Sequence, residues 1–209
     1  MFSNPPLLRP EDCALALVDL QAGLAFGVGS EDRQVVLNNA VALARTAQVF
    51  SIPVVASTSA SRVYSGPMMP AIQAALPDVV PIERRNMNVW EDDAVRTAIE
   101  KTGRKKLLIS GLLTEACVTF GALSAIEAGF EVLVVADACG GITPTSHALA
   151  LRRLEARGAT MTSWIQVLLE LQRDWTRKET YAGARAIVES NAGGYGIGLA
   201  YAKDMIHPS

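Results

Sequence analysis

The sequence is short of the residues that most often build metal sites and disulfide frameworks. Its 209 residues include two histidines, His147 and His207, and three cysteines at wide spacings. No CxxC or HxxxH pair occurs, so a metal site made of several imidazoles or thiolates is excluded within one chain, although a carboxylate site is not. An odd number of cysteines in a chain of this size also argues against a disulfide framework. We therefore expect reduced thiols, no metal and no cofactor.

Runs of one charge and long apolar runs are missing as well. Nineteen basic and 21 acidic residues give a formal net charge of -2, and the basic patch that a nucleic acid requires is absent. No segment reaches the roughly 18 uninterrupted apolar residues of a membrane span. The first residues do not have the basic and then apolar pattern of a signal peptide. We expect a cytoplasmic protein that binds neither nucleic acid nor membranes.

Short apolar runs alternate along the chain with segments of helical periodicity. The runs predict six strands, at residues 13–19, 52–58, 79–82, 106–111, 131–137 and 159–163. The segments between them predict helices at residues 32–50, 69–76, 92–102, 114–128 and 145–157. Regular alternation predicts a three-layer α/β/α, Rossmann-like fold with a parallel sheet of about six strands and ligands outside the carboxyl ends of the strands. One domain is expected over residues 1–209.

The last part of the chain is less regular. Residues 191–198 contain four glycines, and the segment 164–171 holds more apolar side chains than one face of a sheet needs. We expect a homo-oligomer, such as a tetramer or octamer. Residues 176–209 are predicted to be a C-terminal extension that contributes to the oligomer contacts or forms a flexible end.

Cys117 and Asp19 both follow predicted strands. Cys117 would lie in the first turn of a helix, where the helix dipole lowers a thiol pKa and backbone N–H groups stabilise developing negative charge. A small buried core residue is the alternative. Asp19 ends an apolar strand and could accept the thiol proton, or it could cap a neighbouring loop. Arg84 and Arg85 are adjacent, so one is expected to point inward and the other into solvent.

These residues lie in segments that resemble a known family. Val18-Asp-Leu-Gln21, Ile82 to Trp90 and, most specifically, Gly111-Leu-Leu-Thr-Glu-Ala-Cys-Val118 are similar to the isochorismatase-like cysteine hydrolases. Further segments at residues 122–130, 135–139 and 171–175 resemble the YcaC-like branch of that family. The resemblance implies an isochorismatase-like hydrolase fold.

The resemblance also implies a set of site residues. The catalytic triad would be Asp19, Arg84 and Cys117. A cis peptide between Leu112 and Leu113 would turn the Leu113 N–H toward the site, where it and the Cys117 N–H would form the oxyanion hole. The substrate pocket would include Gln21, Asn88, Trp90 and Thr114.

Two departures from the family pattern matter. Most members have lysine at the basic position, whereas this chain offers Arg84, or Arg85 one step on. Arginine does not exchange protons, so it would hold Asp19 and Cys117 in place while Asp19 does the acid–base work. The Asp-x-His metal motif of the nicotinamidases is absent from Ser57 to Tyr64, which disfavours that activity.

The interpretation that follows is a cysteine amidohydrolase that cleaves a small amide-like C–N bond through a Cys117 thioester, with a small molecule as its substrate. A vinyl-ether hydrolase of isochorismatase type, which does not need a cysteine, is a first alternative. A non-catalytic binding or scaffold protein on the same fold is a second, because a fold alone does not fix function.

Overall fold

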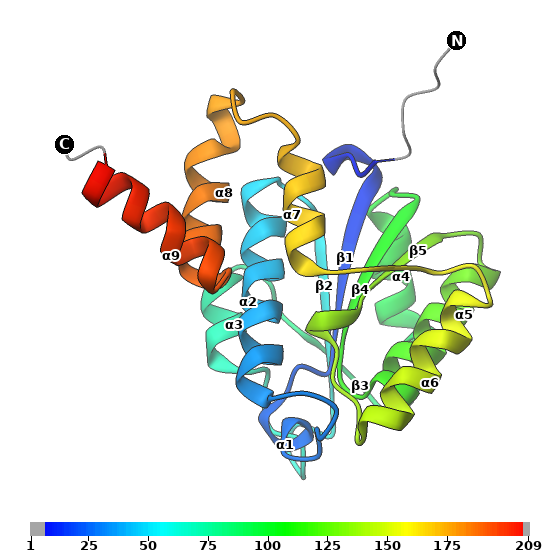
Figure 1. The fold of residues 1–209 in the computed structure, drawn as a ribbon. Coiled ribbons are helices and arrows are strands. Elements are labelled where there is room, and N and C mark those ends of the chain that lie inside the picture. Colours follow the sequence, from blue (N-terminus) through cyan, green and yellow to red (C-terminus); the bar gives the residue numbers. More distant parts are fainter. Residues whose placement is uncertain (1–6, 207–209) are drawn as a thin grey trace.

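A six-stranded parallel sheet lies at the centre of the molecule (Figure 1). The computed structural model describes residues 7–206. The strands are β1 (Cys13–Val18), β2 (Val54–Ser59), β3 (Ile82–Arg84), β4 (Lys106–Gly111), β5 (Glu131–Val135) and β6 (Thr160–Thr162). Their order is β3-β2-β1-β4-β5-β6. The chain order reverses between β1 and β4, and in such sheets ligands bind outside the carboxyl ends of the strands at this point. The predicted fold class is confirmed.

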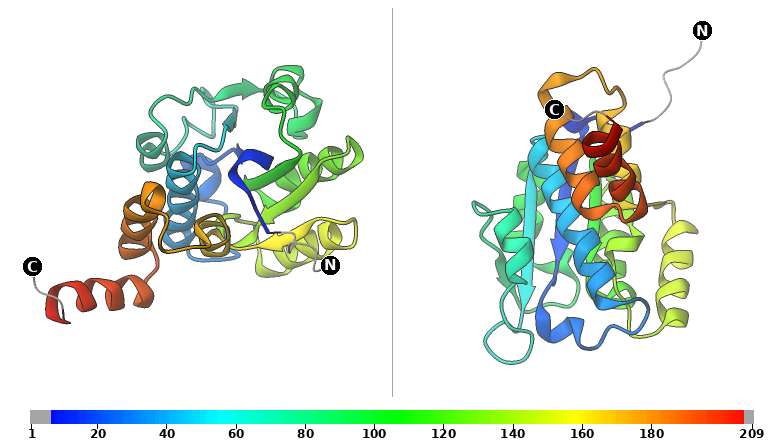
Figure 2. Two further views of the ribbon diagram at one scale, coloured as in Figure 1. Left: turned by 90° about the horizontal axis from the view of Figure 1, so that it is seen from above. Right: turned by 60° about the vertical axis from the view of Figure 1, so that its left-hand side comes forward.

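Helices cover both faces of the sheet (Figures 1 and 2). One layer contains α2 (Arg33–Val49), α3 (Pro70–Ala75) and α7 (Trp164–Gln172), and the other contains α4 (Asp93–Lys101), α5 (Thr119–Glu127) and α6 (Pro144–Glu155). Because side chains alternate along a strand, β1 sends Leu15 and Leu17 into the first layer's core and Ala14 and Ala16 into the second. The sheet is therefore apolar on both faces, as central parallel strands usually are.

The third strand lies later in the chain than the sequence predicts. The apolar run at residues 79–82 suggested a strand there, but β3 comprises Ile82–Arg84 and pairs in register with Ser57, Thr58 and Ser59. Val80 is exposed, and Pro81 has no N–H with which to join the ladder. The shift brings Arg84 into the sheet itself, whereas the sequence placed it in a loop.

The C-terminal part consists of helices joined by short connections in the described residues. α7 buries Trp164, Val167, Leu168 and Leu171 within the same chain, so the expectation that segment 164–171 packs between subunits is wrong for those side chains. α8 (Lys178–Asn191) packs on α2 and α7, whereas α9 (Gly194–Tyr201) contacts mainly α8 and the following π-helical turn Ala202–Ile206. Figure 2 shows α9 extending beyond the body of the molecule. Between residues 7 and 206, no helix combines the length and apolarity needed to cross a bilayer.

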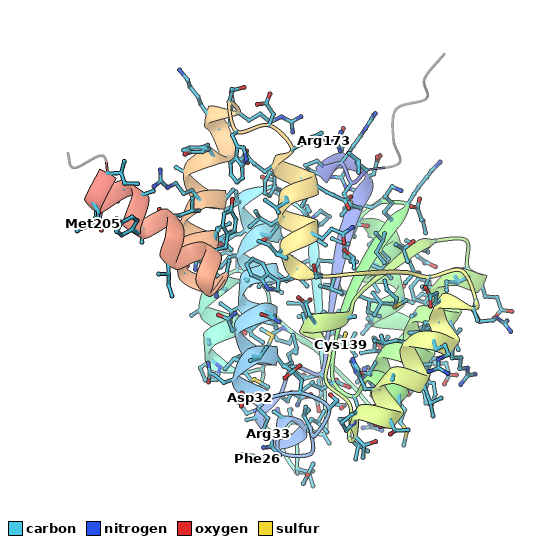
Figure 3. The ribbon with its side chains drawn as sticks, viewed as in Figure 1. Phe26, Asp32, Arg33, Cys139, Arg173 and Met205 are labelled. Atoms are coloured by element: carbon cyan, nitrogen blue, oxygen red, sulfur yellow. The ribbon has the colours of Figure 1, made fainter. Side chains whose placement is uncertain are left out.

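The connection from β1 to α2 is fixed at the carboxyl end of the sheet. It contains the short helix α1 (Ala22–Ala25). Arg33 donates from Nε to the Ala25 carbonyl oxygen at 2.9 Å and from Nη2 to the Phe26 carbonyl oxygen at 3.0 Å. Phe26 and Arg33 lie together at this end in Figure 3. The N-cap side chain of Asp32 starts α2 by accepting from the N–H groups of Gln34 and Val35.

Candidate active site

Cys117 follows β4 across a sharp change of chain direction. Gly111 ends the strand so close to β1 that an added Cβ would lie 2.0 Å from the Val18 carbonyl oxygen, and only glycine fits there. The Leu112–Leu113 peptide bond is cis. Residues Thr114–Val118 then form a π-helical turn, η3, before α5 begins at Thr119. The segment predicted as one helix therefore starts as a wider turn, which contains Cys117.

Asp19 and Arg84 form a buried ion pair beside this turn. Asp19 comes directly after β1 with a positive φ of 54°, and Arg84 ends β3. The Arg84 Nη2 donates to Asp19 Oδ2, and both side chains are 0% exposed. Arg84 Nη1 also donates to the Asn86 carbonyl oxygen. Arg85, in contrast, is exposed. Of the two adjacent arginines, Arg84 is therefore the one that contacts Asp19.

Burial dominates the electrostatics of the site. It raises the pKa of the Asp19 carboxyl, and the Arg84 charge opposes that rise. It also raises the pKa of the Cys117 thiol, and the negative charge of Asp19 raises it further, against the opposing effect of Arg84. The expectation of a lowered thiol pKa is wrong, because desolvation and a nearby carboxylate outweigh the effect of the helix terminus. Cys117 and Ser59 are the uncharged side chains that interact with the Asp19 carboxylate, so the group nearest to the thiol is a proton acceptor.

A cavity of about 440 Å³ opens beside Cys117 at the carboxyl end of the sheet. Its lining consists of Ser59, Ala60, Glu83, Arg84, Arg85, Asn86, Met87 and Cys117. Met87 was not singled out from the sequence. Ser59 is the register partner of Arg84 in the β2–β3 ladder, so its place in the site depends on the strand pairing and not on a motif.

A family model and known relatives match this chain over most of its length. The Isochorismatase domain model matches residues 13–166. This chain belongs to the isochorismatase family. It is 41% identical over 169 residues to the probable hydrolase YcaC of Escherichia coli strain K12, a match that covers 80% of this chain and 81% of that protein. The predicted resemblance to the YcaC-like branch is confirmed, and the chain belongs to a family of hydrolases.

Two solved structures of YcaC proteins share the fold over nearly the whole chain. The Escherichia coli YcaC, described as an octameric hydrolase of unknown specificity, superposes with a TM-score of 0.91 at 36% identity and covers 98% of this chain and 100% of its own. YcaC from Pseudomonas aeruginosa, with hexane-2,5-diol and covalent acrylamide, gives a TM-score of 0.89 at 34% identity and covers 95% and 98%.

In this isochorismatase-family chain, Gln21 does not line the cavity but fixes one of its walls. Its side chain is fully buried. Gln21 Nε2 donates to the carbonyl oxygens of Ser59, at 3.1 Å, and Gly66, and Oε1 accepts from the Ser59 N–H at 2.9 Å. Both hydrogens of the amide are therefore used by backbone. Gln21 holds the two ends of loop 59–66 together next to Asp19.

The other three predicted pocket residues also lie outside the cavity lining. Asn88 caps a short 3-10 helix by accepting from the Trp90 N–H at 3.0 Å, and it donates to Ser124 Oγ at 3.0 Å. Trp90 packs edge-on against Phe130 with ring centroids 5.3 Å apart. Thr114 Oγ1 lies 2.8 Å from His147 Nδ1. None of the three is among the residues that line the cavity.

The other two cysteines lie in the core, away from this site. Cys13, Cys117 and Cys139 are free thiols. Burial raises the pKa of Cys13 to about 11 and that of Cys139 to about 12, so neither forms a thiolate readily near neutral pH. Within the described range 7–206, no three His, Cys, Asp or Glu side chains are grouped to hold a metal ion. His207 lies outside that range.

Proposed function

We propose that this chain is a cysteine hydrolase that cleaves a small amide-like C–N bond through a thioester at Cys117. The observation that carries the proposal is the cavity in which Cys117 lies beside a fully buried Asp19–Arg84 pair. A desolvated carboxylate is costly unless it is paired, and Arg84 supplies that partner. The interaction of the carboxylate with the Cys117 thiol supports its role as the proton acceptor.

The first half-reaction transfers one proton and forms one bond. Because the pKa values of both Asp19 and Cys117 are raised, Asp19 takes the thiol proton as sulfur attacks the carbonyl carbon, and no thiolate accumulates beforehand. The N–H groups of Leu113 and Cys117 stabilise the oxyanion. The C–N bond then breaks, and the leaving ammonia or amine takes the proton from Asp19.

The second half-reaction reverses these roles with water in place of the thiol. Asp19 removes a proton from water as the oxygen attacks the thioester carbonyl. The C–S bond breaks, the proton returns to Cys117 and the carboxylic acid leaves. Arg84 keeps Asp19 oriented throughout and does not exchange protons, since a guanidinium stays charged.

Covalent labelling tests the nucleophile directly. Treatment with limiting acrylamide, followed by intact-protein mass spectrometry and peptide mapping, should modify Cys117 first, because Cys13 and Cys139 are buried in the core, whereas Cys117 is partly exposed and lines the cavity beside Asp19. Cys117→Ala should abolish the adduct. Asp19→Asn should slow its formation at neutral pH, because the proton acceptor is lost.

Turnover tests the bond class. Ammonia release from a panel of small amides should be lost in Cys117→Ala, and a short incubation should trap the acyl group on wild-type Cys117. A Cys117 that is no more reactive than Cys13 would refute the nucleophile. Vinyl-ether hydrolysis that survives Cys117→Ala would favour the isochorismatase-type reaction, and bound ligand without turnover would favour a binding protein.

We also propose that the chain forms a homo-oligomer through α8 and α9. Helix α9 has no charged side chain, and Tyr195, Ile197 and Tyr201 on it are exposed. A helix that is apolar around its circumference is normally buried. The octameric assembly of the Escherichia coli relative supports a second copy of this chain as the partner.

A further inference from the structure

Arg84 and Arg85 are consecutive in sequence but differ in burial and in their contacts. Arg84 is buried and paired with Asp19. Arg85 lines the same cavity, its side chain is exposed, and within residues 7–206 its guanidinium makes no hydrogen bond or ion pair to the protein. A guanidinium offers five N–H donors in a planar fork. All of these donors remain free for a molecule that enters the cavity.

The other charged groups of the lining do not neutralise Arg85. Asp19, beneath the cavity, is balanced by Arg84. Glu83 is the lining's acidic residue, and its carboxylate accepts from Thr58 Oγ1 at 2.8 Å and from the Ser61 N–H at 3.0 Å. Thr58 and Glu83 are register partners, one residue before Ser59 and Arg84. Both oxygens of the Glu83 carboxylate are therefore used by neighbouring groups, and between residues 7 and 206 Glu83 makes no ion pair with Arg85.

We propose that the substrate of this site is a small amide with an anionic group, such as a carboxylate, at the end away from the reacting carbonyl, and that Arg85 binds that group. The inference rests on the proposed cysteine hydrolase. Arg85 would hold a carboxylate through two parallel hydrogen bonds while Cys117 attacks the carbonyl. Because Arg85 stays solvated, it contributes selectivity without the desolvation cost of a second buried cation.

Two alkylating reagents of similar size separate the effect of the reagent's charge from the intrinsic reactivity of the thiol. Iodoacetate is an anion and iodoacetamide is its neutral analogue, and both react with the same thiolate, so the ionisation of Cys117 cancels in their rate ratio. In Arg85→Gln, the ratio of the iodoacetate rate to the iodoacetamide rate at Cys117 should fall about threefold or more. The effect is limited to this size because water partly screens the attraction between an exposed arginine and the anionic reagent. High salt should lower the wild-type ratio in the same direction.

Arg157 provides a matched control. It is an exposed arginine just after α6 and does not line the cavity. Arg157→Gln removes the same charge, and we expect it to keep the wild-type ratio, whereas Arg85→Lys should retain part of the preference. An equal ratio in wild type and Arg85→Gln would overturn the inference while leaving the cysteine hydrolase in place.

A binding measurement decides the inference even if Cys117 proves unreactive toward both reagents, the outcome that would refute the proposed function. In Cys117→Ser, saturation-transfer NMR would compare succinamate with the neutral succinamide. Tighter binding of succinamate that disappears in Cys117→Ser/Arg85→Gln supports the anion preference. Equal binding of the two molecules overturns it.

Discussion

At the scale of single residues, the proposed mechanism ties activity to the ionisation of Asp19. In that mechanism the carboxylate is ionised when it takes the thiol proton, and burial raises its pKa above that of an ordinary aspartate. Activity should therefore fall as the pH drops through this raised value, at a pH higher than that for an ordinary aspartate. A pH profile of kcat/KM checks this expectation through the position of its acid limb.

Asp137 gives a control for that profile. Its pKa is also raised by burial, but its side chain accepts from the Trp164 N–H at 2.9 Å and lies outside the cavity lining. Asp137→Asn should leave the acid limb where it is. The assignment of the acid limb to Asp19 would be wrong if the limb shifts in Asp137→Asn but stays in place in Ser59→Ala, a change in the cavity wall next to Asp19.

The sequence predicted which residues meet at the candidate site better than it predicted their pKa values. Motifs after two strands located Asp19 and Cys117, and the structure brings both to Arg84 in one place. The sign of the thiol pKa shift could not be predicted, since it depends on burial and on a carboxylate 98 residues away in the chain, at residue 19 against residue 117. The family resemblance implied a pocket position for Gln21, and only the fold shows that backbone atoms use its amide.

At the scale of elements, the Gln21 side chain ties β1 to loop 59–66. Gln21→Ala would leave the N–H and carbonyl of Ser59 and the carbonyl of Gly66 without this partner. Unsatisfied buried groups of this kind cost about 1–3 kcal/mol, so we expect a loss of that order in the free energy of unfolding. The value of kcat/KM should fall as well, because Ser59 lines the cavity.

Urea unfolding and turnover measure the two effects of Gln21→Ala. Gln48, an exposed residue on α2, provides the same substitution without the buried contacts, and Gln48→Ala should change neither quantity by much. If Gln21→Ala unfolds at the wild-type urea concentration, loop 59–66 is held by other contacts and the role assigned to Gln21 is incorrect.

The ends of an element could be predicted where a strong apolar pattern marks it. They could not be predicted where pairing with a neighbouring strand defines the element. The central strands at β1, β4 and β5 follow from their apolar runs. The short edge strand β3 contains Glu83 and Arg84 and carries no such signal; pairing with β2 defines it. The apolar side of α7 could not be assigned to the core in advance, because nothing in the sequence shows that α8 and α2 pack beside it.

At the scale of the whole molecule, α9 is an apolar helix that the described chain leaves largely exposed. Ile197 is 71% exposed and Tyr201 is 58% exposed, and Met205, in the turn that follows, lies at the far end of this arm (Figure 3). A groove of about 540 Å³ runs beside it, lined by Trp175, Tyr181, Arg185, Tyr195, Leu199, Ala202 and Lys203. Helix α9 and the groove both belong to the C-terminal part of the chain. Two copies related by a two-fold axis can therefore each bury the other's α9.

A charge placed on the exposed side of α9 should therefore break the assembly without unfolding the chain. Ile197→Asp puts a carboxylate into the proposed contact, where an unpaired buried charge is strongly unfavourable, and analytical ultracentrifugation should show a smaller species than for the wild type. Val80→Asp makes the same change at a valine that is 83% exposed and far from α9 in sequence, and it should keep the wild-type mass. If Ile197→Asp keeps that mass as well, the oligomer does not depend on α9, and the helix requires a different partner.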